Sequence, residues 1–356
     1  MQRIGIIGIG NISGIYLKNL TEMFGGRVKV TASADIIFDR AKQAAGKYNL
    51  KAFNSAEELA NYSDVDLVLN ITPPNVHYEV ALAAVNAGKH IYNEKPLCSK
   101  REDAAQLLKA AAEKGVRVGG APDTFLGAGI QTCRKLIDDG RIGKPVAATA
   151  VMMKQGPESW HPNPDFFYKD GGGPMFDMGP YYVTTLVNLL GPVARVSGSA
   201  KITSPVRTIT NSYNYGAVIN VEVPTHIAGV LDFACGAVGT IVTSFDVHSH
   251  SLPFIEIYGT EGTLRVPDPN TFDGPVFVRR FNEEEAKMPL QKNYSENSRG
   301  LGLTDMAEAI DEGRPHRASA ELAFHVLDIM HSIHDASASE KYINLKSKCE
   351  RPEALA

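Results

Sequence analysis

Cysteine is scarce in this sequence, and the few residues of this type do not cluster. Cys98, Cys133, Cys235 and Cys349 lie far apart along the 356 residues. A CxxC redox pair or a zinc site built on paired cysteines requires closer spacing, so neither is expected. We interpret the four side chains as reduced thiols, which is typical of a cytoplasmic protein.

The sequence also lacks long apolar runs and an excess of charge of one sign. No segment approaches the roughly 20 apolar residues that a membrane-spanning helix needs. The chain begins MQRIGIIGIG, without the three regions of a secretory signal, and this favours a cytoplasmic location. With 36 basic and 40 acidic residues the formal net charge is -4, so no basic surface is expected to attract nucleic acid. Neither a membrane nor a nucleic-acid partner is expected.

Histidine pairs and glycine runs offer no recognised metal or Walker-type site. His248 and His250 are two residues apart, and His331 and His334 are three apart. Neither pair has a cysteine or carboxylate nearby in a zinc-binding spacing, so no metal site is expected. The GGGP at 171–174 is not followed by GK[ST], which excludes a Walker loop there.

Predicted strands and helices alternate over about the first 120 residues. Strand-like segments stand at 3–9, 28–35, 64–72, 89–94 and 116–120, and helix-compatible segments follow the first four of them. This alternation predicts a parallel sheet with helices on both faces. The total length favours two domains.

The pattern changes after Ala121 and Pro122. From Val146 onward, strand-like segments follow one another without helices between them, which predicts a mostly antiparallel sheet. One helix is expected to begin near Gly179 and Pro180, and a last one covers about 319–336. The segment 282–300 is polar enough to be a mobile excursion.

A glycine turn follows the first predicted strand and suggests a nucleotide site. Gly8, Gly10 and Asn11 would let the backbone approach a pyrophosphate, while the next helix presents free N–H groups to it. Ser13 stands where a third glycine or an alanine is usual. The motif alone is therefore equally compatible with a structural turn.

Asp35 ends the second predicted strand and strengthens the nucleotide interpretation. A carboxylate there can accept hydrogen bonds from both hydroxyls of an adenosine ribose and would repel a 2'-phosphate. Ile36 and Ile37 follow it and offer no arginine to such a phosphate, so NAD is favoured over NADP. The alternative for Asp35 is a carboxylate that caps the turn. We add Ile12 and Arg40 to the expected cofactor-binding residues.

Three segments together resemble one protein family. They are GIIGIGNIS near the start, TPPNVHYEVALAAVNAGKHIYNEKPL in the middle and GGGPMFDMGPYY at 171–182. They resemble the glucose-fructose oxidoreductase and inositol dehydrogenase (Gfo/Idh/MocA) family. The resemblance implies an α/β protein with a doubly wound Rossmann domain at 1–121. It also implies an α+β domain at 122–356, whose large open, mostly antiparallel sheet forms subunit contacts in a homodimer or homotetramer.

The same resemblance assigns roles around the triplet Glu94, Lys95 and Pro96. Lys95 would be the lysine of the catalytic site, and Pro96 often follows a cis peptide bond in this family. The nicotinamide half of the cofactor would be lined by Thr72, Pro73, Asn75, His77 and Glu94. Desolvation and a cationic nicotinamide disfavour a charged lysine, so Lys95 could relay the proton of a substrate hydroxyl. The alternative is an ordinary charged residue at a turn.

The third segment departs from the family, because Tyr181 stands where many members have a histidine. Asp177 precedes Tyr181 by four residues, which puts both side chains on one side of a helix. A tyrosine hydroxyl can relay a proton if a neighbouring lysine stabilises its anion. We expect Tyr181 to act as acid or base and Asp177 to bind substrate hydroxyls, with Lys95 polarising the substrate. The alternative for Tyr181 is a packing residue at a helix start.

The segment SWHPNPDFFYKDGGG at 159–173 contains the only tryptophan, Trp160, beside His161. Aromatic rings among hydrogen-bonding groups suit the apolar faces and hydroxyl rims of sugars and cyclitols, so both residues are expected to bind substrate. The alternative is a loop held together by its own aromatic residues. Lys154 and His248 are weaker candidates for the same site.

These observations predict an NAD-dependent oxidoreductase that acts on a secondary hydroxyl of a sugar, sugar derivative or cyclitol. One alternative is a glycosidase of the same family that uses bound NAD for transient oxidation and regenerates it in each turnover. Another is a non-catalytic sensor of sugar or NAD. A pure sensor needs no proton relay, so the presence of Lys95, Asp177 and Tyr181 disfavours it.

Overall fold

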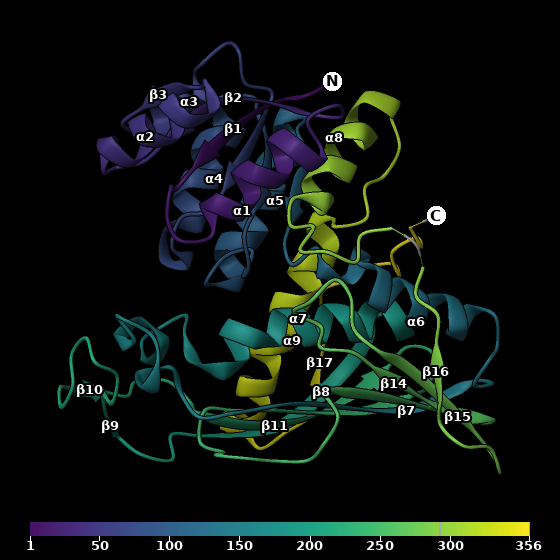
Figure 1. Ribbon diagram of the computed structural model, residues 1–356. Helices are drawn as coiled ribbons and strands as arrows, with labels where there is room; N and C mark the ends of the chain where they lie inside the picture. Colours follow the sequence, from purple (N-terminus) through teal and green to yellow (C-terminus); the bar gives the residue numbers. More distant parts are fainter. Residues whose placement is uncertain (292, 356) are drawn as a thin grey trace. The chain divides into compact units, whose positions relative to one another are not determined.

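The computed structural model describes residues 1–291 and 293–355. They form two compact units (Figure 1). The first comprises Met1–Leu126 and Glu296–Phe324, and the second comprises the described residues of 127–295 and 325–355. No pattern in the sequence predicted that residues 296–324 belong to the first unit. The boundary expected at 121/122, and the roles assigned on either side of it, stay predictions.

A sheet of six parallel strands forms the centre of the first unit, in the order β3-β2-β1-β4-β5-β6. The strands are β1 Arg3–Ile7, β2 Lys29–Ala34, β3 Lys51–Phe53, β4 Leu67–Asn70, β5 His90–Asn93 and β6 Val118–Gly120. The strand order reverses between β1 and β4, and ligands of such sheets bind beside the carboxyl ends at this point. The predicted doubly wound parallel sheet is confirmed.

The helices of the first unit follow the strands as the sequence pattern predicted, with two additions. They are α1 Ser13–Lys18, α2 Phe38–Tyr48, α3 Ala56–Ala60, α4 His77–Asn86, α5 Arg101–Lys114 and α8 Leu301–Glu312. The short α3 and the later α8 were not expected. Single helical turns lie at Asn19–Met23, Pro74–Val76 and Thr124–Leu126, and the first residues of α9 (Ala320–Ser339), up to Phe324, also belong to this unit.

A nine-stranded sheet forms the second unit, in the order β16-β15-β14-β13-β7-β12-β11-β8-β17. Its strands are β7 Pro145–Met153, β8 Val193–Lys201, β11 His226–Phe233, β12 Val238–Ser244, β13 Ile255–Gly259, β14 Gly262–Val266, β15 Val276–Arg280, β16 Ala286–Met288 and β17 Ile343–Asn344. The β7–β12 pair is parallel, and the other pairings of the described strands are antiparallel. The large, mostly antiparallel sheet is therefore confirmed. Two short strands, β9 Val206–Thr208 and β10 Val218–Asn220, pair apart from it.

Helices lie on one face of this sheet (Figure 1). They are α6 Ala128–Asp138, α7 Gly173–Leu190 and the part of α9 (Ala320–Ser339) from His325 onward. The helix α7 begins earlier than predicted and contains Pro180 in its interior. The true start signal is Pro174, because proline fits the first turn of a helix, where its missing N–H leaves no gap.

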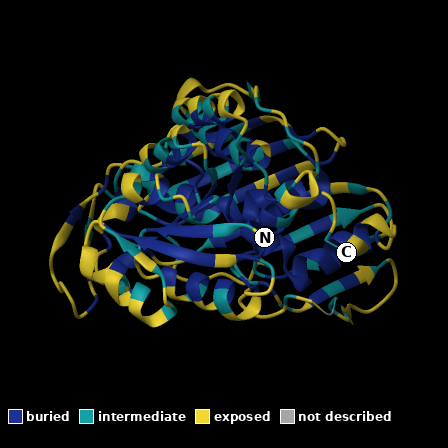
Figure 2. Cartoon of the chain, turned by 90° about the horizontal axis from the view of Figure 1, so that it is seen from above, coloured by how far each residue is buried: buried dark blue, intermediate teal, exposed yellow. Residues whose placement is uncertain are grey.

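Buried residues are concentrated in the strands and on the helix faces that pack against them (Figure 2). Along β11, buried and partly exposed residues alternate without interruption, as they do when one face of a sheet is covered. Among the described residues, no helix combines the length and apolar character required to cross a membrane.

Candidate active site

The glycine turn lies at the carboxyl edge of the parallel sheet, where β1 ends. Gly8 has a φ of +98°, and a Cβ atom there would lie 2.8 Å from backbone atoms of Ile71 and Thr72 beyond β4. Glycine is therefore required by both conformation and space. A Cβ on Gly10 would meet nothing within 4 Å, so this side of the turn is open.

Ser13 explains why the third glycine of the usual pattern is not needed. Its hydroxyl donates to the Gly10 carbonyl at 2.6 Å, and its backbone N–H points to the same oxygen at 3.2 Å. The side chain thus closes the turn before α1. Asn11 and Ile12 are exposed on the turn, and their contact with a cofactor stays a prediction.

Asp35 joins the two turns that follow β1 and β2. One carboxylate oxygen accepts the N–H of Ile9 at 2.7 Å and the other accepts the N–H of Ile37 at 2.7 Å. Asp35 therefore has the capping role that was its alternative interpretation. An ionised carboxylate offers about four acceptor positions, so capacity remains for ribose hydroxyls. Ile36 is 91% exposed, and Arg40 is exposed in the first turn of α2.

Two buried asparagines connect the carboxyl ends of β4 and β5. The Asn70 amide donates to Asn93 Oδ1 and to the His77 carbonyl, each at 3.1 Å. Asn70 Oδ1 accepts the Thr72 hydroxyl at 2.6 Å, and the Asn93 amide donates to the Leu97 carbonyl at 2.9 Å. Sequence reasoning did not single out this pair. The available signal was an asparagine at the end of two consecutive predicted strands.

The buried His77 ring links the two loops that follow β4 and β5. Its ring is fully buried, with Nδ1 2.8 Å from the Pro96 carbonyl oxygen and Nε2 2.8 Å from the Thr72 carbonyl oxygen. Burial lowers the pKa of His77. Its expected place in the cofactor site is thus indirect, through the loops it holds. Pro73 and Asn75 are exposed in the first of these loops.

Glu94 holds the backbone at Lys95. One oxygen of the Glu94 carboxylate accepts the Tyr16 hydroxyl at 2.7 Å, and the other accepts the Lys95 backbone N–H at 2.8 Å. Tyr16 is buried, and burial together with the Glu94 charge raises the pKa of its hydroxyl well above the usual value. Lys95 is half-buried, and the Lys95–Pro96 peptide bond is cis.

A further carboxylate at this edge was missed by sequence reasoning. Asp123, just after β6, is 1% exposed, and its Oδ2 accepts the N–H groups of Gly300 at 2.9 Å and Gly302 at 3.0 Å. Desolvation raises the pKa of Asp123 to about 6. The neighbouring Tyr92 hydroxyl is buried and has no hydrogen-bond partner within the described chain. Perturbed carboxylates of this kind cluster at functional sites.

In the second unit, Asp177 and Tyr181 lie one turn apart on α7. Their four-residue spacing places both side chains on one side of the helix, as predicted. Asp177 is partly exposed and Tyr181 is 7% exposed. Their catalytic roles stay predictions.

Trp160 and His161 lie in a loop whose aromatic rings contact one another, mostly edge to face. The His161 ring lies 5.4 Å from that of Trp160 and 5.2 Å from that of Phe167, measured between centroids. The Lys154 ammonium lies 5.9 Å from the Trp160 ring centre. The loop is thus held by its own aromatics, while Trp160 remains 55% exposed and accessible. His248 is exposed in the segment after β12, two residues beyond Asp246, which forms a backbone bridge with Gln155.

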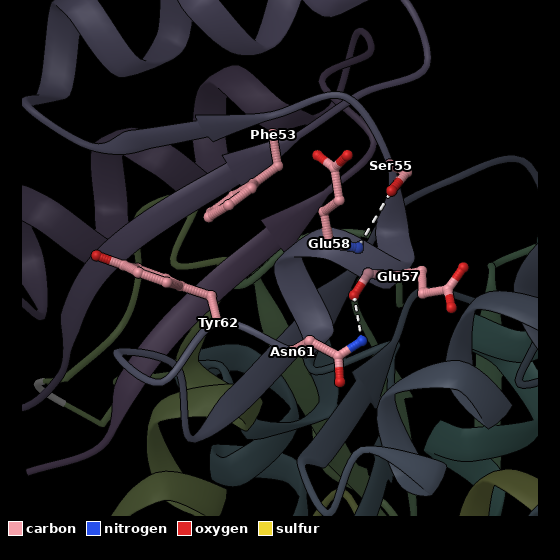
Figure 3. A pocket seen from close by; sticks show the side chains of 6 residues that line it. All are labelled: Phe53, Ser55, Glu57, Glu58, Asn61 and Tyr62. Carbon is pink, nitrogen blue, oxygen red and sulfur yellow. Dashed lines mark hydrogen bonds between the residues drawn. The ribbon is translucent and has the colours of Figure 1, made fainter.

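A shallow hollow between β3 and α3 does not form a comparable site (Figure 3). It is lined by Phe53, Ser55, Glu57, Glu58, Asn61 and Tyr62. The Ser55 hydroxyl accepts the Glu58 N–H at 3.1 Å and the Asn61 amide donates to the Glu57 carbonyl at 2.9 Å, so these groups cap α3. Within residues 1–291 and 293–355, no group of three or more histidine, cysteine, aspartate or glutamate side chains is placed to hold a metal ion.

Comparison with protein families gives two matches along the chain. Residues 2–121 match an oxidoreductase family with an NAD-binding Rossmann fold, and residues 130–265 match the GFO/IDH/MocA C-terminal domain. A 1,5-anhydro-D-fructose reductase of Ensifer adhaerens is 30% identical over 297 residues, which are 82% of this chain and 83% of the relative. An inositol 2-dehydrogenase 3 of Saccharopolyspora erythraea is 29% identical over 75% of this chain and 73% of its own.

Solved structures show the same fold over nearly the whole length. An NAD binding oxidoreductase from Klebsiella pneumoniae has a TM-score of 0.85 at 24% identity, covering 98% of this chain and 99% of the other. A levoglucosan dehydrogenase in complex with NADH and levoglucosan has a TM-score of 0.82 at 20% identity, covering 97% and 99%. The chain therefore belongs to the GFO/IDH/MocA family of oxidoreductases, and residues 2–121 form its NAD-binding Rossmann fold.

Proposed function

We propose that this protein is a dehydrogenase that transfers hydride between a secondary hydroxyl of a sugar, sugar derivative or cyclitol and the nicotinamide of NAD. The observation that carries the proposal is the fixed position of Lys95 at the carboxyl edge of an NAD-binding sheet. The names of the relatives support the substrate class, because one is an anhydrofructose reductase and another an inositol dehydrogenase.

The residues around β1 and β2 fit an NAD molecule. The open side of the turn at Gly10, with Asn11 and Ile12 beside it, would admit the pyrophosphate to the backbone. Asp35 has free acceptor positions for the ribose hydroxyls, and its charge would repel the 2'-phosphate of NADP. Bound NAD supplies an acceptor for hydride.

Lys95 would exchange the proton of the substrate hydroxyl. The Glu94 carboxylate, which accepts its backbone N–H, keeps the residue in place, and a cationic nicotinamide bound beside it would disfavour the charged form of the lysine. Hydrogen bonds of Thr72, His77, Asn70 and Asn93 fix the loops that follow β4 and β5. In the second unit, we assign Tyr181 as acid or base, Asp177 as a partner for substrate hydroxyls, and Trp160 and His161 as substrate-binding residues.

We also propose that the protein works as a homodimer or homotetramer in the cytoplasm. The outer face of the nine-stranded sheet supports association, because its side chains are small or uncharged at neighbouring positions such as Thr149, Val230 and Thr240. The thiols of Cys98 and Cys133 are buried and form no disulfide, which suits a reducing compartment.

The test is an assay that follows two signals with one panel of compounds. Purified protein and NAD are mixed with sugars, glycosides, sugar acids and inositols, and both NADH absorbance and released sugar are recorded. NADH formed with one class of compound supports the proposal and names the substrate class. Sugar release without net NADH would replace it with a redox glycosidase, and silence in both signals across the panel would contradict it.

A further inference from the structure

The chain between β8 and β11 makes an excursion that ends on the loop of Trp160. We call residues 202–225, with β9 and β10, the excursion, and residues 156–169 the Trp160 loop. In Figure 1 the β9–β10 hairpin stands apart from the nine-stranded sheet. The backbone N–H groups of Thr210 and Asn211 donate to the Glu158 carbonyl at 3.0 and 3.2 Å, and that of Glu222 donates to the Tyr168 carbonyl at 2.9 Å. The excursion therefore contacts both ends of the Trp160 loop.

Arg207 on β9 lies between two carboxylates of other segments. Its guanidinium forms an ion pair with Asp246, beyond β12, and lies 3.5 Å from Glu158 Oε1 in the Trp160 loop. Asp246 also accepts the Thr225 hydroxyl at 2.8 Å. The Arg207, Glu158 and Asp246 side chains are only 16%, 7% and 14% exposed. Without the arginine, two buried carboxylates would face each other unpaired, which is strongly unfavourable.

The Glu158 carboxylate also closes the Trp160 loop on itself. Its second oxygen accepts the Tyr168 hydroxyl, ten residues along the chain, and the Arg207 guanidinium lies 5.8 Å from the Tyr168 ring centre. Gly156 leaves the space for this pair, because a Cβ there would collide with both the Tyr168 hydroxyl and the Glu158 carboxylate. The Glu158–Tyr168 hydrogen bond thus joins the two ends of the Trp160 loop, and Arg207 contacts both of these residues.

Asn211 holds the backbone on either side of Trp160. Its amide nitrogen donates to the Glu158 carbonyl at 3.2 Å and to the His161 carbonyl at 2.7 Å. Its amide oxygen accepts the Tyr213 N–H at 2.9 Å, so the side chain, which is 6% exposed, has partners at both ends. More than half of the Trp160 surface is exposed, and so packing alone does not fix the indole.

We propose that Arg207 and Asn211 are positioning residues that set the orientation of Trp160 for binding of a sugar or cyclitol ring. The inference rests on the proposed function, in which Trp160 contacts the substrate. Aromatic faces bind the apolar face of a sugar ring, and this requires a fixed plane. Preorganisation by Arg207 and Asn211 removes the cost of ordering the loop when the substrate binds. The excursion thereby acts on substrate affinity without touching the substrate.

The experiment uses Trp160 as its own reporter, because the chain contains a single tryptophan. The variants are Arg207→Met, Arg207→Lys, Asn211→Ala and Gly156→Ala, with Arg141→Met, at an exposed arginine after α6, as the matched control. Arg207→Lys keeps the charge and loses the forked geometry, whereas Gly156→Ala disturbs the Glu158–Tyr168 pair without removing a charge. Circular dichroism first establishes which variants fold, and the folded ones are compared.

In the folded variants, we expect the Trp160 emission to shift to the red and its anisotropy to fall, while the control matches the wild type. The KM for the substrate found in the panel should rise on the order of tenfold, while kcat changes less than about threefold. NADH affinity should be unchanged. Unchanged fluorescence and KM in folded Asn211→Ala and Arg207→Lys would overturn the inference, as would a loss of kcat at constant KM.

Failure of the proposed function is distinguishable from failure of the inference. If the wild type oxidises no compound of the panel, the dehydrogenase proposal fails. The fluorescence comparison still decides whether the excursion orders Trp160, because it needs no turnover. If the wild type is active and the variants keep its fluorescence and its KM, the dehydrogenase proposal stands and the positioning role is refuted.

Discussion

At the residue scale, the proton-transfer proposal depends on a lysine whose backbone is fixed and whose side chain is half-buried. Glu94 uses one carboxylate oxygen for the Lys95 backbone and the other for Tyr16, so it serves as a support for Lys95. The structure places these groups on the first unit alone. The expected cofactor contacts at Gly8 and Asp35 lie on other turns of this unit, so substitution at Lys95 should separate proton transfer from cofactor binding.

We expect Lys95→Ala to lower kcat by about 10²–10⁴-fold, the usual contribution of a positioned acid or base. NADH affinity should stay within about threefold of wild type, because the turns at Gly8 and Asp35 are untouched. Initial rates and titration of NADH fluorescence measure the two quantities. Lys100→Ala, at an exposed lysine five residues later, is the control. Near-normal turnover in Lys95→Ala would refute the assignment.

Asp123 provides a prediction of pH dependence. Desolvation raises its pKa to about 6 in the folded protein, above the ordinary value of 3.8. The folded protein therefore holds this proton more tightly than the unfolded chain, and the ionised form lowers stability above pH 6. The penalty shrinks as the pH falls through the folded pKa and disappears below 3.8. The groups that interact with this carboxyl include Tyr16, Tyr92, Glu94 and Arg299, together with the N–H groups of Gly300 and Gly302.

Asp123→Asn removes the ionisation and keeps an oxygen that can accept the same N–H groups. The variant should exceed wild type in free energy of unfolding at pH 7.5, by at most about 3 kcal/mol, and the difference should diminish by pH 4.5. Urea unfolding at pH 4.5, 5.5 and 7.5 measures this. The exposed Asp170→Asn serves as control. A difference that is the same at all three pH values would show that Asp123 does not titrate in this range.

At the element scale, the turn between β1 and α1 contains two glycines with different reasons to be glycine. Gly8 is required by the fold, because its φ is positive and a Cβ would strike the backbone beyond β4. Gly10 is under neither constraint, and in the proposed function its small size lets the pyrophosphate approach the backbone. Stability and cofactor affinity should respond in opposite ways at the two positions.

Gly10→Ala should leave thermal stability nearly unchanged and weaken NADH binding at least about tenfold, because the added methyl group occupies the approach to the backbone. Gly8→Ala should lower the free energy of unfolding by roughly 1–3 kcal/mol or more, through conformational strain and collision. Calorimetry and NADH titration of both variants test the pair. Equal losses of stability at Gly8 and Gly10 would contradict the separation.

The strands and helices could be predicted where the local sequence carried both an apolar pattern and a turn or cap residue at the end of the segment. The alternation through residue 120 indicated five of the six parallel strands, since each apolar run ended in a turn residue. The three-residue β3 is too short to show a period. The start of α7 was misplaced because Pro180 was taken as a start signal when Pro174 is the one at the first turn. The helices α6 and α8 were not predicted, and both bury polar residues that do not indicate core positions, such as Gln131 and Arg134 in α6 and Asp305 in α8.

At the scale of the whole molecule, the features that could not be predicted from the sequence are those that depend on contacts between residues far apart in the chain. Residues 296–324 return to the first unit and place Gly300 and Gly302 on Asp123, a contact that spans more than 170 positions. The excursion and the Trp160 loop likewise meet across about 50 positions. The glycine turn and Asp35 could be singled out because each follows a predicted strand, and Glu94 and Lys95 were singled out by the resemblance to the family. The groups that hold them, such as Asn70, Asn93 and Asp123, were not.

The proposed homo-oligomer gives the prediction that concerns the whole molecule. Thr240 is exposed at the centre of the outer sheet face, opposite Val230 on β11 and Thr149 on β7. A lysine there would place a charge in any interface that uses this face, and charges are depleted from interface cores because desolvation is costly. Thr240→Lys should therefore dissociate the oligomer at micromolar concentration and leave the fold intact, since the side chain is exposed.

Light scattering after size exclusion measures the mass of wild type, Thr240→Lys and the control Thr208→Lys, which carries the same change on the β9 hairpin. We expect a dimer or tetramer for wild type and control, and a monomer for Thr240→Lys. If Thr240→Lys keeps the wild-type mass, association uses another surface. A monomeric wild type would refute association altogether, and the outer face would then have to remain solvated through polar and charged residues such as Thr240, Glu256 and Arg265.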